Sequence, residues 1–168
     1  MALVTGAWNL LLPKGTPLHR RAGRLYVAAM LIANLGILAV YRFDIASFRP
    51  FRGGPGIFGI FHWEAVTTLA LLALAVYAAP RQRRAVWAYI HPIAMLLTYY
   101  ILVGGLINEM FVRVTVLRAM VGSGRSFFAS PIVGLTQSAA MLLFIVMLVY
   151  FVVRVALWRS KPATAQPT

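Results

Sequence analysis

A chain of 168 residues with 61% hydrophobic and 11% charged residues has room for one domain and too much apolar surface for a soluble globule. Lipid must therefore be the solvent for much of it. The absence of cysteine excludes disulfides, thiolate metal sites, iron-sulfur clusters and thioether-linked haem. The net charge of +13 fits either nucleic acid or an anionic membrane. Because the basic residues lie beside apolar stretches, we expect a lipid partner and no nucleic acid.

The two ends of the chain predict no span of their own. Residues 1–12 have neither a basic segment nor a small-residue cleavage site, so they do not predict a signal peptide, and they are too short to cross a bilayer. Residues 161–168, rich in Pro, Ala and Thr, predict a short disordered tail. We therefore expect one transmembrane helical domain over residues 1–160.

Four apolar stretches predict an all-α fold, an integral membrane bundle of four transmembrane helices. A helix needs about 20 apolar residues to cross about 30 Å of hydrocarbon. The stretches are 25–41, 56–79, 85–107 and 132–153. Beyond the third, the helical spacing of Val112, Val116 and Met120 predicts an amphipathic helix at the membrane interface.

The basic residues predict the orientation of these spans. Ten lie on one side of the predicted bilayer: Lys14, Arg20, Arg21, Arg24, Arg81, Arg83, Arg84, Arg154, Arg159 and Lys161. Six lie on the other: Arg42, Arg49, Arg52, Arg113, Arg118 and Arg125. Positive charge favours the cytoplasmic side, so we expect a multi-pass protein of the cytoplasmic membrane with both termini in the cytoplasm.

Polar side chains near the outer ends of the spans form one candidate site, since polar groups in hydrocarbon are costly. The helical rise places His62 about 25 Å from the cytoplasmic end of its span, at the level of Glu109. Glu109 and Arg113 are four residues apart, which predicts a structural ion pair. Alternatively, His62, Glu64 and Glu109 could hold a divalent metal or relay protons. Asn108 and Gln137 are expected at the same level.

A second candidate site lies at the inner side. His19 and His91 share that side and could together hold the iron of a b-type haem. Because Pro92 frees the carbonyl one turn earlier, His91 could instead bond to that carbonyl or to headgroups. The arginines beside His19 are suited to anionic lipid headgroups. These are Arg20, Arg21 and Arg24.

Two classes of function remain open from the residues. The favoured one is a structural, assembly or binding protein, working as a homo-oligomer or within a larger membrane complex, and not an enzyme. The other is a haem- or metal-binding redox protein; a small oligomeric transporter is a weaker alternative. Hydrolase and nucleotidase motifs are absent from the sequence.

The segment leading into the first span carries a resemblance to a known family. Its Lys14-Gly15, His19-Arg20, Gly23-Arg24 and Tyr26 resemble the hallmark of a prokaryotic predicted-membrane-protein family catalogued as domain of unknown function 2306. Phe61-His62, His91, Asn108-Glu109 and Arg113 are similar to one branch of it. The resemblance assigns no activity, but it marks His19, His62, His91, Glu109 and Arg113 as candidate site residues.

The chain departs from the family before this motif. In the family a complete helix usually precedes the basic segment, whereas here only Ala2 to Leu12 precede it. We therefore expect a shortened form or an internal start. In that case the apolar stub is half of a fifth helix and the N-terminus lies on the other side.

Overall fold

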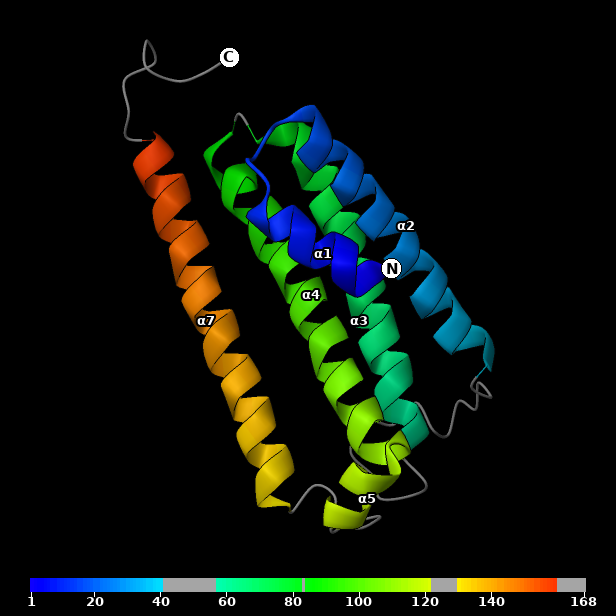
Figure 1. Cartoon of the computed structure of the whole chain (residues 1–168). Helices are drawn as coiled ribbons and strands as arrows, with labels where there is room; N and C mark the ends of the chain where they lie inside the picture. The colour runs from blue at the N-terminus through cyan, green and yellow to red at the C-terminus, as the bar shows by residue number, and fades with distance from the viewer. Residues whose placement is uncertain (41–56, 83, 122–129, 160–168) are drawn as a thin grey trace. The chain divides into compact units, whose positions relative to one another are not determined.

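The structure, a computed structural model, describes residues 1–40, 57–82, 84–121 and 130–159. All regular structure in these residues is helical, which confirms the all-α prediction (Figure 1). The elements are α1 (Ala2–Leu11), α2 (Pro17–Val40), α3 (Ile57–Ala78), the 3-10 helix η2 (Ala79–Arg81), α4 (Ala85–Arg113), α5 (Thr115–Val121) and α7 (Pro131–Arg159).

Four of the described helices are long and apolar enough to cross a membrane. Their apolar segments are Pro17–Ala39, His62–Arg81, Ala85–Phe111 and Pro131–Leu157. This confirms the four predicted spans, with α1 as a short additional helix of ten residues. The fold therefore indicates a multi-pass helical membrane protein.

The ends of the helices differ from the apolar stretches that predicted them. Helix α2 begins at Pro17 rather than at residue 25, so the arginines before the first apolar stretch are helical. Helices α4 and α7 continue past residues 107 and 153, to Arg113 and Arg159. The amphipathic helix predicted from residue 112 is α5, which begins only at Thr115 because Val114 adopts extended backbone angles. The predicted tail, 161–168, lies outside the described residues.

The chain divides into two compact units, Met1–Ala73 and Leu74–Thr168, and each is described by itself. The single domain over residues 1–160 stays a prediction. In the first unit, α1 packs against α2. Helix α2 buries a stripe of residues spaced four apart, which lie on one helical face. The stripe consists of Ala22, Tyr26, Met30 and Asn34.

In the second unit, α4 packs against α7, and the two helices run side by side (Figure 1). Buried Phe111 of α4 and Val133 of α7 form a small core, against which Ile107 and Leu117 pack. Elsewhere along α7, Phe151 is the other side chain that is buried among those described. Most of this very apolar helix is thus exposed, as a helix surrounded by lipid would be.

Candidate functional site

The turn between α1 and α2 is fixed by Lys14 and Gly15. The Lys14 ammonium donates to the carbonyl oxygens of Asn9 at 2.8 Å and of Leu10 at 3.1 Å. These carbonyls belong to the last turn of α1, where no further helical N–H reaches them, and a positive charge there also favours the helix dipole. Gly15 has a φ of +81°, a conformation that glycine adopts without strain.

Thr16 and Pro17 then begin α2. The Thr16 hydroxyl oxygen accepts the backbone N–H of His19 at 3.2 Å and donates to the carbonyl of Pro13 at 2.9 Å. This is N-cap geometry, and proline suits the first helical position because its missing N–H would have no helical partner there. His19 is therefore placed in the first turn of α2 by its own backbone, with its ring partly buried.

Three arginines lie in the first two turns of α2. Arg20, Arg21 and Arg24 are all exposed, while Ala22 between them is buried. Acidic residues are absent from the first 40 positions of the sequence. We call Lys14 to Arg24 the basic corner, since the turn and the first turns of α2 form one strongly positive surface.

His91 joins α4 to the end of α3. Its Nδ1 lies 2.8 Å from the carbonyl oxygen of Ala75, which is one of the last four residues of α3. Because that oxygen only accepts, Nδ1 carries the proton. The partner is thus a carbonyl of the preceding helix rather than the one that Pro92 frees within α4. A histidine so placed links α4 to the end of α3 through a side-chain to backbone contact.

Two tyrosine–arginine pairs at helix ends were missed by sequence reasoning. Arg81 donates to the carbonyl of Tyr77 at 2.6 Å and lies over its ring at 3.6 Å, and that ring meets Trp87 edge to face at 5.4 Å. Arg154 donates to the Tyr150 hydroxyl at 3.1 Å and also lies near its ring. The signal was the four-residue spacing of each pair. Such aromatic and basic residues typically lie at a membrane interface.

At the other end of α4, the expected polar residues form two separate contacts. Arg113 Nε donates to a carboxylate oxygen of Glu109, as their spacing predicts. Gln137 of α7 donates its side-chain amide to Asn108 Oδ1 at 2.8 Å and to Gly104 O at 3.5 Å. A polar bridge thus links the two neighbouring helices within their apolar surroundings.

This bridge predicts a measurable coupling. Asn108→Leu should cost about 1 kcal/mol of unfolding free energy, because it leaves the Gln137 amide with only the long contact to Gly104. Adding Gln137→Leu should recover most of the loss. Unfolding by SDS titration would measure both, with Ser138→Ala on the exposed side of α7 as the control. Additive losses would show that the two residues are not coupled.

The remaining predicted site residues fall in different parts of the chain. His62 is buried and Glu64 is partly exposed, both in α3 within the first unit, whereas Glu109 belongs to the second. Likewise His19 and His91 belong to different units. Among the described residues, no three His, Asp or Glu side chains gather in a way that could hold a metal ion. The metal and haem sites stay predictions.

Comparison with known proteins yields no relative. No protein-family model matches the chain, and neither the curated proteins nor the solved structures contain a significant match to it. The fold therefore defines the class, a multi-pass helical membrane protein.

Proposed function

We propose that this chain is a structural or binding protein of the cytoplasmic membrane that holds anionic lipid headgroups at its basic corner. The observation that carries the proposal is the exposure of Arg20, Arg21 and Arg24 in the first two turns of a membrane-spanning helix. Residues at the start of a span lie at headgroup depth, where guanidinium groups bind phosphate with two parallel hydrogen bonds.

The polar side chains elsewhere in the spans support a structural rather than a catalytic role. His91 bonds to a carbonyl of α3, Glu109 pairs with Arg113, and Gln137 bridges to Asn108. The contacts of His91 and Gln137 each join two helices, and the pair Glu109–Arg113 lies within α4. Assembly with further copies of the chain or within a larger membrane complex is part of the same proposal.

The proposed orientation has both termini in the cytoplasm. The excess of Lys and Arg at that side supports it. Membership of the family of unknown function 2306 is part of the same proposal, supported by the motif from Lys14 to Tyr26.

Analysis of co-purifying lipids tests the proposal. The protein would be extracted in a mild detergent and its retained phospholipids measured by mass spectrometry, beside those of the membrane from which it came. We expect phosphatidylglycerol and cardiolipin to be enriched over phosphatidylethanolamine. Retained lipids that match the bulk membrane in composition would overturn headgroup binding at the basic corner.

Haem binding is the second candidate function, and the hydrogen bond from Nδ1 of His91 favours it. A histidine ligand commonly donates one ring N–H to a backbone carbonyl while its other nitrogen binds the metal. Nδ1 of His91 donates in this way to Ala75. Absorption spectra of the oxidised and dithionite-reduced protein, with elemental analysis for iron, zinc and copper, decide the matter. A reduced b-type band that His91→Ala abolishes would establish the redox function; a colourless, metal-free sample would exclude it.

A further inference from the structure

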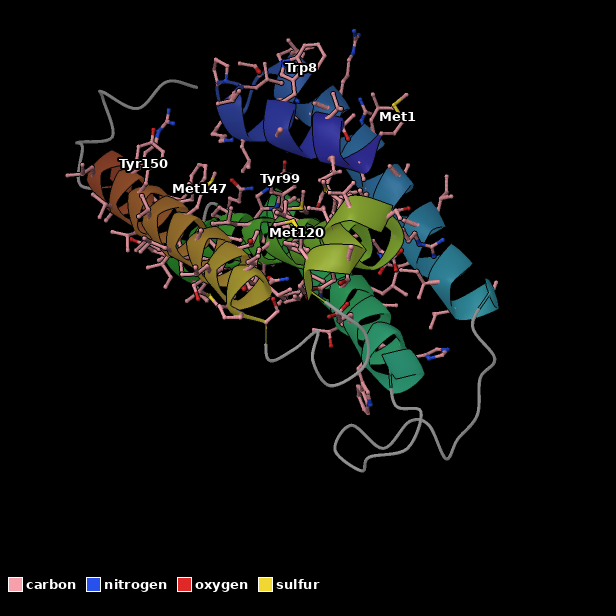
Figure 2. All side chains as sticks on the ribbon, turned by 60° about the horizontal axis from the view of Figure 1, so that its bottom comes forward. Met1, Trp8, Tyr99, Met120, Met147 and Tyr150 are labelled. Atoms are coloured by element: carbon pink, nitrogen blue, oxygen red, sulfur yellow. The ribbon has the colours of Figure 1, made fainter. Side chains whose placement is uncertain are left out.

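Helix α1 has apolar residues on two opposite sides. It packs against α2, and Gly6 is buried, with Leu3 and Leu10 partly buried. The other side is open: Val4 is 66% exposed, Trp8 54% and Leu11 85%. These three residues and Met1 are spaced three and four apart, so they form one continuous stripe. Figure 2 shows the side chains of Met1 and Trp8 pointing outward from α1. An apolar stripe of this kind is unfavourable in water.

The Thr5 hydroxyl and the carbonyls at the end of α1 have partners within the chain, whereas Asn9 Oδ1, on the side toward α2, is buried without one. The Thr5 hydroxyl donates to the carbonyl of Met1 at 3.0 Å, one turn back on the same helix. At the other end, the N–H of Leu12 donates to Trp8 O, and Lys14 supplies donors to the next two carbonyls. A helix in hydrocarbon needs such internal partners because lipid supplies no donors. These groups of α1 can therefore lie in an apolar environment without losing a hydrogen bond.

The contact with α2 limits how deep α1 can lie. A Cβ atom at Gly23 would lie 3.5 Å from the Asn9 side-chain nitrogen, so α1 passes close to α2 there. Gly23 is about 9 Å along α2 from Pro17 by helical rise. The helix itself, with ten residues, is about 15 Å long. Both lengths are no more than half of a hydrocarbon core of about 30 Å.

The charge next to α1 identifies what covers its open side. Helix α1 ends at the basic corner, and the sequence contains no acidic residue before Asp44. A positive surface beside an apolar stripe complements the headgroups and acyl chains of an anionic phospholipid leaflet.

We propose that α1 lies within one leaflet of the bilayer, with Val4, Trp8 and Leu11 in contact with phospholipid acyl chains and Lys14 at headgroup level. The choice of lipid as the occupant rests on the proposed headgroup binding at the basic corner, and the contact of α1 with acyl chains goes beyond it. Helix α1 enters the leaflet beside α2 and is too short to cross the bilayer.

Spin labels test this directly, since the chain contains no cysteine and single cysteines can be placed at will. Val4→Cys and Trp8→Cys would place a nitroxide on the open stripe. Leu142→Cys, on the exposed apolar side of α7, serves as the hydrocarbon reference, and Gln82→Cys, exposed after η2, as the water-side reference. Each labelled protein is reconstituted in phosphatidylethanolamine–phosphatidylglycerol vesicles, and its accessibility to oxygen and to a water-soluble nickel chelate is measured by power saturation.

The expected result is that labels at Val4 and Trp8 collide with oxygen, as the label at Leu142 does, and lose the collisions with nickel that the label at Gln82 shows. Accessibility to nickel equal to that at Gln82 would place α1 in water and overturn the proposal. Protection from both reagents would also overturn it, because protein rather than lipid would then cover the stripe. Two labelled positions guard against one variant that fails to fold, and the result is independent of the lipid analysis.

Discussion

Replacement of Tyr26 by alanine is expected to be the most destabilising substitution in the first unit, at a cost of about 3 kcal/mol in unfolding free energy. Tyr26 is 1% exposed and is among the largest fully buried side chains described. In a bilayer the transfer of apolar surface contributes little, because lipid is as apolar as the protein interior. The loss therefore comes from the cavity and the missing van der Waals contacts, which surrounding helices refill only in part.

Leu25 supplies the matched control for this prediction. It is the neighbour of Tyr26 on α2 and is 62% exposed, so Leu25→Ala removes a large side chain from the open side of the same helix turn. We expect that variant to unfold within about 0.5 kcal/mol of the wild type. Loss of helical circular dichroism in an SDS titration measures both. Equal losses for the two variants would show that α2 does not pack through the stripe containing Tyr26.

The existence of the spans was predictable because lipid imposes a simple rule on sequence. Twenty apolar residues are needed to cross the hydrocarbon, and four stretches supply them. The ends were less predictable, as α2 shows. The count of apolar residues predicted that this helix begins at residue 25, but Thr16 is its N-cap and Pro17 is its first residue. A threonine followed by proline is a helix-start signal that hydropathy alone does not weigh.

In the candidate site, likewise, the contact within one helix was predictable and the contacts between helices were not. The pair Glu109–Arg113 followed from the spacing within one helix. The partner of His91 did not, because Ala75 O lies on another helix sixteen residues away and a backbone carbonyl leaves no mark in the sequence. The bridge from Gln137 to Asn108 likewise depends on which faces of α4 and α7 meet. Only the expectation that these two residues share a level could be drawn beforehand.

The motif from Lys14 to Tyr26 gains a physical explanation from the structure. Lys14 caps α1, Gly15 makes the turn, and Thr16 caps α2, so this part of the motif builds a corner between two helices. Tyr26, further along α2, is buried within the first unit. The arginines are different, because they are exposed and make no visible contribution to the turn. Their exposure fits the proposal that they bind lipid headgroups.

The triple variant Arg20→Gln, Arg21→Gln and Arg24→Gln is accordingly expected to lose anionic lipid while keeping its fold. A basic residue near an anionic surface contributes about 1 kcal/mol, so the three together give about 3 kcal/mol, or roughly 100-fold in affinity. Binding of phosphatidylglycerol to the protein in detergent, followed by native mass spectrometry, would measure the change. The variant should unfold at the same SDS concentration as the wild type.

Two further variants test whether this binding depends on the charge, the hydrogen-bonding geometry or the location of the three arginines. Replacing the same three arginines by lysine keeps the charge but removes the two-pronged hydrogen bonding, so we expect an intermediate affinity. Arg113→Gln removes a charge equally exposed but paired with Glu109 and assigned to the opposite interface, and it should leave binding unchanged. If the glutamine variant binds phosphatidylglycerol as tightly as the wild type, the basic corner is not the lipid site. If Arg113→Gln weakens binding as much, net charge rather than the corner attracts the lipid, since exposed charges act over about 10 Å at moderate salt.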